Sequence, residues 1–463
     1  MTSTVTTVNP ATGVVLSVYQ TSTAEQIEHS VAAGAITAEA WGRQPLETRM
    51  AAVRRLANVL RQQKDTFAQL VTAEMGKPLG EAAEELEKSA VTAEYYASQA
   101  PTILGDEKVE IDGVEAWVSY EAIGLVLAVM PWNFPVWQVM RFAIPSVTAG
   151  NGVLLKHSPN VTGSALALQQ IFLDAGLPEH LVTTLVVAET DVPDVIEGLI
   201  NDDRIAAVTL TGSNRAGAAV GSAAGRASKK SVLELGGSDA FVVLDDADVP
   251  AAAAAAVKAR YRNAGQSCVC SKRFIVAASV AKEFIDLFVS GAKALVVGDP
   301  TDVRTDVGPL ARADLRDALQ RQVDASVAGG AVLLAGGRPV DGDGFFYEPT
   351  VVAGTGPGVP VFDEETFGPV AAIAVSDSDA AAVKLANATQ FGLSLSVWTS
   401  DVERGVELAK QITTGAVFIN AITASDARMP FGGTKKSGYG RELAAAGVRE
   451  FTNIRTYWTV AAT

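Results

Sequence analysis

Short runs of aliphatic and β-branched residues alternate with alanine-rich stretches of helical length along most of the chain. In the first half, runs typical of buried strands occupy residues 123–130, 152–155, 181–187, 205–211 and 240–244. Stretches with helical character follow some of these strands, at residues 164–175, 215–227 and 249–264. Strands and helices that alternate in this way predict α/β units with mostly parallel sheets.

The second half repeats the alternation, with strands predicted at residues 274–276, 331–334, 370–375, 394–398 and 416–420. The first 100 residues are predicted to be mainly helical, at residues 40–63, 64–75 and 79–99. A chain of 463 residues is too long for one core, and roughly two to three domains are expected at this length. We place the main boundary at Gly236-Gly237, where a strand ends in a glycine turn.

Composition narrows the classes of partner. Hydrophobic residues make up 48% of the chain and charged residues 19%, which predicts a large core and excludes global disorder. The net charge is −15 and no long Lys/Arg run is present, so nucleic acid and anionic membranes are poor partners. A small anionic substrate would need a local basic pocket.

The ends and the cysteine content predict a location. Residues 1–7 are polar and lack the pattern of a signal peptide, and apolar runs such as 123–130 are too short to span a bilayer. Two cysteines argue against a disulfide framework and favour the cytoplasm. The histidines are scattered and Cys268-Val-Cys270 lacks a second ligand pair, so no metal site is expected.

Three segments carry side chains suited to one chemistry. Cys268 lies in Asn263-Ala-Gly-Gln-Ser-Cys268-Val-Cys270, 34 positions after Glu234 in Leu233-Glu234-Leu235-Gly236-Gly237. Upstream, Asn133 lies in Pro131-Trp132-Asn133-Phe134-Pro135. A thiol can attack a carbonyl, an amide can stabilise the oxyanion, and a carboxylate can activate water. Together they can form and hydrolyse a thioester.

In order and spacing these segments resemble the aldehyde dehydrogenase superfamily, and the resemblance extends from Asn9-Pro-Ala-Thr-Gly13 to Lys436-Ser-Gly-Tyr-Gly-Arg-Glu442. It implies an α/β fold with two doubly wound Rossmann-like domains and a small β oligomerisation arm, in a homodimer or homotetramer. The cofactor-binding domain is then residues 1–108 and 125–236, and the catalytic domain 237–435. The oligomerisation domain is residues 109–124 and 436–463; residues 109–121 show strand-like alternation.

The resemblance also implies a role for each residue of the trio. Cys268 forms a thiohemiacetal with the aldehyde, while the Asn133 amide and the Cys268 N–H form an oxyanion hole, typically worth about 3–4 kcal/mol per donor. Glu234 then acts as the general base that hydrolyses the thioester. Relatives that pass the acyl group to coenzyme A typically lack this glutamate, so a free acid is the expected product.

The cofactor site lacks a Gly-x-Gly-x-x-Gly fingerprint and a phosphate loop. Gly212 and Ser213 instead lie where a strand runs into a helix, whose free N–H groups suit a pyrophosphate. On its own such a turn is more often merely structural. The resemblance nevertheless assigns it to the cofactor, together with Trp132, Glu365 and Phe367, the last two in Glu364-Glu365-Thr-Phe367-Gly-Pro369.

Cofactor preference depends on the end of the strand that contains Lys156. In the family this lysine contacts the adenosine ribose, and NAD-selective relatives often carry a glutamate three residues later. Here that position is Pro159, so no carboxylate repels a 2′-phosphate, which Lys156 and Ser158 could hold. We therefore expect NADP, with NAD also usable.

Asn133, Trp137 and Arg141 are spaced i, i+4, i+8 and would share a helix face if Pro135 opens the helix. This arrangement suits a bifunctional substrate with an aldehyde at one end and an anion at the other. Arg262 supplies a second candidate cation; judged singly, each arginine is more often a surface residue.

Arg141, Arg262 and Ser425 match the positions that hold the substrate carboxylate in succinate semialdehyde dehydrogenases, and the chain most resembles their bacterial NAD(P)-dependent branch. We expect oxidation of succinate semialdehyde to succinate, as in 4-aminobutyrate degradation. Glutarate semialdehyde or a broad range of aldehydes is an alternative. A catalytically silent structural or binding protein on the same fold is another.

Cys270, two residues after the predicted nucleophile, has two interpretations. A buried free cysteine is most often a packing residue. Some semialdehyde dehydrogenases with the same Cys-x-Cys pattern use the pair as a reversible disulfide switch, so Cys270 is also a possible redox partner of Cys268.

Overall fold

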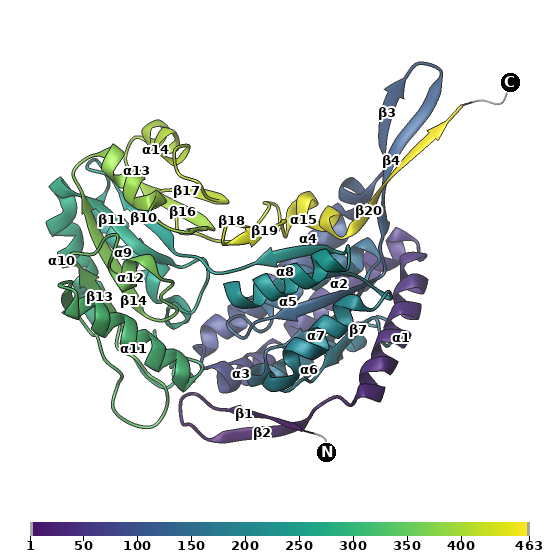
Figure 1. Ribbon diagram of the computed structural model, residues 1–463, viewed down its shortest axis with the longest axis horizontal. Helices are drawn as coiled ribbons and strands as arrows, with labels where there is room; N and C mark the ends of the chain where they lie inside the picture. The colour runs from purple at the N-terminus through teal and green to yellow at the C-terminus, as the bar shows by residue number, and fades with distance from the viewer. Residues whose placement is uncertain (1–2, 461–463) are drawn as a thin grey trace.

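The computed structural model describes residues 3–460 and contains two large sheets, each flanked by helices. They lie side by side in the ribbon, and a three-stranded arm projects beyond one of them (Figure 1). The predicted class, α/β with two doubly wound Rossmann-like domains, is confirmed.

The first sheet has the strand order β19-β9-β8-β5-β6-β7. All neighbours pair in parallel except β19, which is antiparallel to β9. Its strands are β5 (Leu125–Met130), β6 (Gly152–His157), β7 (Val182–Leu185), β8 (Ile205–Thr211), β9 (Lys230–Glu234) and β19 (Gly438–Tyr439). Every residue of β5 and β6 is buried, as expected for parallel strands covered on both faces.

The second sheet has the order β12-β13-β14-β11-β10-β16-β17, parallel except for β12 at its edge. Its strands are β10 (Asp239–Val243), β11 (Ser271–Ala277), β12 (Val332–Ala335), β13 (Thr350–Ala353), β14 (Val370–Ser376), β16 (Ser394–Trp398) and β17 (Ala416–Ile419). Strands β9 and β10 are separated by residues 235–238, so the chain passes between the sheets at the predicted glycine turn.

The helices of the first half are α1 (Ala24–Gly42), α2 (Leu46–Gln62), α3 (Lys64–Met75), α4 (Leu79–Leu104), α5 (Trp137–Ala149), α6 (Thr162–Asp174), α7 (Val192–Asn201) and α8 (Asn214–Arg226). The single helix predicted at residues 40–63 is wrong. The helix ends before Pro45, because a proline disfavours helical geometry in the residue before it. A new helix then begins at Leu46, and the predicted start at residue 40 misses the capping box of Thr23 and Gln26.

The helices of the second half are α9 (Val249–Tyr261), α10 (Ala278–Ala294), α11 (Ala313–Ala328), α12 (Pro360–Asp363), α13 (Asp379–Asn387), α14 (Val402–Ala409) and α15 (Ala444–Glu450). The helix predicted at residues 249–264 ends early, because Asn263, Ala264 and Gly265 have φ of 52°, 51° and 71°. A Cβ on Gly265 would lie 2.5 Å from the Gly368 carbonyl oxygen. The loop that contains Cys268 follows directly after this turn.

The arm is an antiparallel sheet of β3 (Glu107–Ile111), β4 (Val114–Ala122) and β20 (Thr452–Thr459). Trp117 and Tyr457 stack across it, with ring centroids 4.7 Å apart. On its way to β20, the chain pairs through β18 (Thr434–Lys435) with β15 (Phe391–Gly392), and then through β19 with β9. The remaining hairpin is formed by β1 (Thr4–Val8) and β2 (Val15–Gln20).

No helix in residues 3–460 is long and apolar enough to cross a membrane.

Candidate active site

Cys268 lies in the loop between the turn Arg262–Gly265 and β11, at the meeting point of two cavities. One cavity has a volume of about 150 Å³ and the other about 250 Å³, and Cys268 lines both. Two molecules can therefore approach the same sulfur from different sides.

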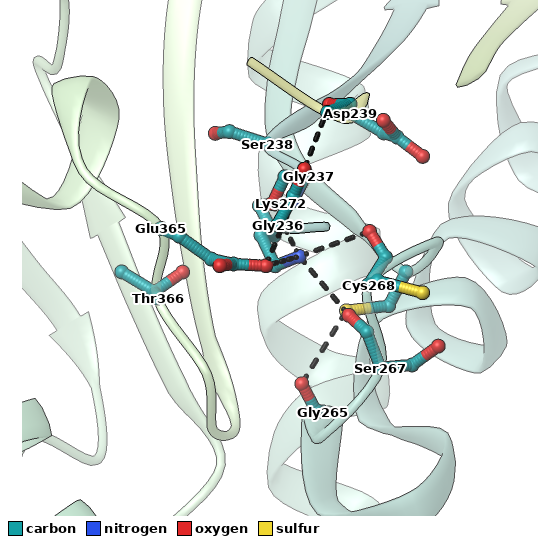
Figure 2. A network of polar contacts seen from close by, with 12 residues as sticks. Gly236, Gly237, Ser238, Asp239, Gly265, Ser267, Cys268, Lys272, Glu365 and Thr366 are labelled. Carbon is teal, nitrogen blue, oxygen red and sulfur yellow. Dashed lines mark hydrogen bonds and ion pairs between the residues drawn. The ribbon is translucent and has the colours of Figure 1, made fainter. Parts of the chain in front are cut away.

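The loop is held by a buried lysine. The Lys272 ammonium donates to the carbonyl oxygens of Gly237 at 2.6 Å, Ser267 at 3.0 Å and Cys268 at 3.2 Å, and lies 3.2 Å from Glu365 Oε1 (Figure 2). Its side chain is fully buried. Because a buried ammonium must satisfy three donors, Lys272 fixes the loop that contains Cys268 to the glycine turn and to Glu365. The sequence analysis did not identify this residue.

The glycine turn after β9 leaves room for these neighbours. Glu365 Oε1 accepts a hydrogen bond from the Gly237 N–H at 2.9 Å. A Cβ on Gly237 would lie 2.5 Å from the Cys268 carbonyl oxygen, so any other residue here would displace the loop that contains Cys268. The Gly-Gly pair is therefore needed for close approach.

Asn133 lies in the loop that leads into α5. At the start of this helix, Glu85 Oε1 accepts hydrogen bonds from the Val136 N–H at 2.7 Å and the Trp137 N–H at 2.6 Å, as an N-terminal carboxylate should. Buried Lys77 pairs with the same Glu85 carboxylate. Asn133 is buried and its Nδ2 donates to the Gln266 carbonyl at 3.1 Å, which leaves its second hydrogen for another acceptor.

His157 supports the same loop. Its Nδ1 accepts from the Ser158 N–H at 2.8 Å, so the proton is on Nε2, which donates to the Pro135 carbonyl at 2.9 Å. Burial lowers the pKa of His157 to about 4, and the ring is neutral at physiological pH.

Glu234 ends β9 and is buried beside a second carboxylate, Glu442. Burial raises the pKa of Glu234 well above its usual range, and the charge of Glu442 raises it further; Arg141 and Arg441 oppose both effects. Within residues 3–460, neither Glu234 oxygen has a hydrogen-bond partner. A buried carboxyl with a raised pKa and free lone pairs is suited to take a proton from water or a thiol.

Arg141 is fully enclosed and paired. It forms an ion pair with Glu442, its Nη2 lies 3.4 Å from Thr211 Oγ1, and its guanidinium lies 4.4 Å from the centre of the Phe431 ring. Its charge also favours the thiolate of Cys268. Arg141 thus links the Glu442 carboxylate to the surroundings of Cys268.

Burial raises the pKa of the Cys268 thiol to about 12, opposed by the charges of Arg141 and Lys272 and reinforced by Glu365 and Glu234. In the cofactor-free protein the sulfur is therefore a thiol at neutral pH. Forming the thiolate requires a base or a rearrangement of charge when substrate and cofactor bind.

This state predicts a pH dependence of alkylation. In the cofactor-free protein, the rate of Cys268 modification by iodoacetamide should rise about tenfold per pH unit from pH 7 to at least pH 10, since the thiolate fraction rises with pH below the pKa. Mapping of the alkylated peptide separates Cys268 from Cys270. A rate that levels off below pH 8 would contradict the raised pKa.

The cavity of about 250 Å³ contains most of the residues predicted for the cofactor. Ser213 caps α8 by accepting from the Ala216 N–H at 3.3 Å, and the rings of Trp132 and Phe367 meet edge to face at 5.6 Å. The cavity lining includes Trp132, Asn133, Gly212, Ser213, Cys268, Glu365 and Phe367.

Lys156 and Ser158 lie beyond this cavity, at and just after the end of β6. Lys156 is buried, and burial lowers the pKa of its ammonium, while Glu189 partly opposes that effect. Ser158 Oγ donates to Asn160 Oδ1 at 2.7 Å. The two residues are separated by His157, and their contact with a ribose or phosphate stays a prediction.

The residues predicted for the substrate all line the cavity of about 150 Å³, together with Cys268: Trp137, Arg141, Arg262 and Ser425. Arg262 forms an ion pair with Glu84 and lies 3.9 Å from Glu81. Ser425 Oγ accepts a hydrogen bond from Lys88 Nζ at 2.6 Å. Lys88 was not identified from the sequence.

Cys270 points into the protein. Its thiol donates to the Ser267 carbonyl at 2.9 Å and accepts from Arg260 Nη1 at 2.7 Å. A disulfide with Cys268 would have to break both contacts, and the redox switch stays a prediction. Residues 3–460 contain no group of three side chains that could hold a metal ion.

Comparison of the sequence and the fold with known proteins shows the family of this chain. The model of the aldehyde dehydrogenase family matches residues 1–457. The chain is 47% identical to the Escherichia coli K12 protein named succinate semialdehyde dehydrogenase [NAD(P)+] Sad, over 97% of both chains. It is 44% identical to a probable succinate-semialdehyde dehydrogenase [NADP(+)] of Synechocystis, over 98% of this chain and 99% of that one.

Solved structures agree. The succinic semialdehyde dehydrogenase of Streptococcus pyogenes, in complex with NADP+, superposes with a TM-score of 0.95 at 36% identity, covering 99% of this chain and 100% of that one. The family assignment thus rests on sequence and fold alike. The chain belongs to the aldehyde dehydrogenase family.

Proposed function

We propose that the protein oxidises succinate semialdehyde to succinate, with NADP+ or NAD+ as the oxidant. The observation that carries the proposal is that the cavity containing Cys268 is lined by four basic side chains, Lys88, Arg141, Lys258 and Arg262. A substrate that ends in a carboxylate suits such a cavity, even though the whole chain carries a net charge of −15. The named activity of its most similar curated relatives supports the same substrate.

The chemistry divides into two covalent steps on Cys268. The sulfur adds to the aldehyde carbon and gives a thiohemiacetal, whose oxygen can be held by the free hydrogen of Asn133 Nδ2 and the Cys268 N–H. Loss of hydride from that carbon then leaves a thioester. Water, activated by Glu234, displaces the sulfur and releases the acid. Overall, aldehyde, water and oxidised cofactor give carboxylic acid, reduced cofactor and a proton.

The residues present fit a nicotinamide dinucleotide, which when bound accepts the hydride. The free N–H groups at the start of α8, after Gly212 and Ser213, suit its pyrophosphate. Glu365 and Phe367 border the same cavity as Cys268 and suit the nicotinamide end. Lys156 is a buried cation with no ion pair in the described part of the chain, which suits ribose hydroxyls or a 2′-phosphate.

NADP is the preferred cofactor in this proposal and NAD is also usable. Pro159 leaves no carboxylate three residues after Lys156, and several similar relatives carry NADP(+) or NAD(P)+ in their names. We also propose a homodimer or homotetramer formed through the arm of β3, β4 and β20, and a cytoplasmic location, which the two free cysteines favour.

Steady-state kinetics with matched aldehydes tests the proposal. The kcat/KM for succinate semialdehyde should exceed that for butanal by at least about 10²-fold, since a site with buried polar groups penalises an analogue that leaves them unpaired. Glutarate semialdehyde gives the chain-length preference, and each aldehyde is assayed with both cofactors. Equal values for charged and neutral aldehydes would support a broad dehydrogenase, and no turnover would support a silent protein.

A further inference from the structure

We propose that Lys88 binds the carboxylate of the aldehyde substrate, with Ser425 as its partner donor; this rests on the proposed function. The arginines at the predicted positions have carboxylate partners within the protein, whereas Lys88 is a cation of the same cavity that has none in the described part of the chain. Lys88 thereby becomes a specificity-determining residue.

The position of Lys88 follows from one face of α4. Glu81, Glu84, Glu85 and Lys88 are spaced i, i+3, i+4 and i+7, so they share a face, and all four line the substrate cavity. Lys88 is half-buried, and its ammonium makes two contacts: 2.6 Å to Ser425 Oγ and 4.2 Å to the centre of the Trp137 ring.

Of the other cations of the cavity, Lys258 is exposed to solvent, and both arginines are neutralised. Arg141 is paired with Glu442, and Arg262 is paired with Glu84 and lies 3.9 Å from Glu81. The acid beside Ser425, Asp426, is also neutralised, because it pairs with Arg428 at 2.6 Å. Glu85, the remaining acid on this face, pairs with Lys77 and caps α5.

The energetics favour an incoming anion at this position. Burial, together with the positive charges of Arg141 and Arg262, lowers the pKa of Lys88 to about 8, while Glu85 and Asp426 partly oppose the shift. A bound carboxylate would supply the anionic partner that Lys88 lacks in the described part of the chain. It would also favour the protonated form of the lysine. Lys88 and Ser425 together offer one charged and one neutral donor to its two oxygens. The Trp137 ring would then pack against the methylene groups between the carboxylate and the aldehyde.

The test compares Lys88→Met with Lys64→Met, which removes the same charge from α3, away from the cavity lining. The measured quantity is kcat/KM for succinate semialdehyde divided by kcat/KM for butanal. We expect Lys88→Met to lower this ratio at least about tenfold, mainly through KM, and Lys64→Met to change it less than about twofold. Lys88→Arg keeps the charge and should restore part of the ratio.

A pH profile separates charge from shape. In the wild type the ratio should fall as pH rises through about 8, because the ammonium loses its proton. Titration of Cys268 and Glu234 should change kcat/KM for both aldehydes alike, because both substrates use these residues. The effect therefore cancels in the ratio. Burial raises the pKa of Glu81, which lines the same cavity, to about 7, so the profiles are compared from pH 8 upward. In Lys88→Met the ratio should stay flat between about pH 8 and pH 10, and in Lys88→Arg it should also stay flat, at a higher level, because a guanidinium remains charged.

The outcomes are distinct for the two proposals. A wild type with no preference for the charged aldehyde overturns the proposed function and the Lys88 assignment with it. A wild type that prefers the charged aldehyde, together with a Lys88→Met variant that keeps the preference and its pH profile, overturns the Lys88 assignment alone. A variant that loses kcat/KM equally for both aldehydes indicates a structural role and also overturns it.

Discussion

Replacing Cys268 with alanine is expected to reduce kcat for aldehyde oxidation by at least about 10⁴-fold, because no nearby group can take over as nucleophile. Cys270 also borders the smaller cavity, but its thiol is buried and bonded to the Ser267 carbonyl at 2.9 Å. Steady-state production of reduced cofactor measures the loss. Cys270→Ala is the matched control, since it removes the neighbouring thiol and leaves Cys268 in place.

The site of acylation can be read directly. Trypsin cleaves after Arg262 and after Lys272, so residues 263–272 form one peptide that contains both cysteines. Fragmentation of this peptide from enzyme quenched during turnover should place the acyl group on Cys268. An adduct on Cys270, or substantial activity in Cys268→Ala, would be incompatible with the proposed mechanism.

Replacing Glu234 with glutamine is expected to lower kcat by about 10²–10⁴-fold, the usual contribution of a general base. The amide fills the same buried position but cannot accept the proton of the attacking water. The thioester should therefore accumulate: rapid mixing should show one equivalent of reduced cofactor per active site, followed by very slow turnover.

The size and rate of this burst distinguish the two steps in which Glu234 can act. A full, fast burst places its role in hydrolysis, and the acyl group should then be found on the peptide of residues 263–272 without quenching. A slow burst would show that Glu234 also takes the proton of Cys268. Unchanged steady-state turnover in Glu234→Gln would exclude it as the base.

The sequence was sufficient for the parallel core because strands such as β8 and β16 are short, apolar and bounded by turn residues, and their predicted limits match. Helix ends were harder to predict. The ends of α1 and α9 depend on Pro45 and on three consecutive residues with positive φ, which a periodic pattern does not contain.

The site was predictable where a residue belongs to a motif and unpredictable where it depends on tertiary contacts. Cys268, Glu234 and Asn133 stand in recognisable segments. The structure places Cys268 and Asn133 on one cavity, and Glu234 close enough for its charge to raise the pKa of Cys268. Lys88 and Lys272 are single lysines, a type that usually lies at the surface. Lys88 meets Ser425 across 337 positions of sequence, so no local pattern could reveal the contact.

The arrangement of two cavities around one sulfur has a consequence for how such enzymes diversify. Residues of α4 and of the loop that contains Ser425 border the smaller cavity, whereas Gly212, Ser213 and Phe367 border the larger one. Substitutions on the wall of the smaller cavity can therefore change the aldehyde that is oxidised while the cofactor stays the same. A single reactive centre can in this way serve a whole series of aldehydes, each requiring new side chains on one wall alone.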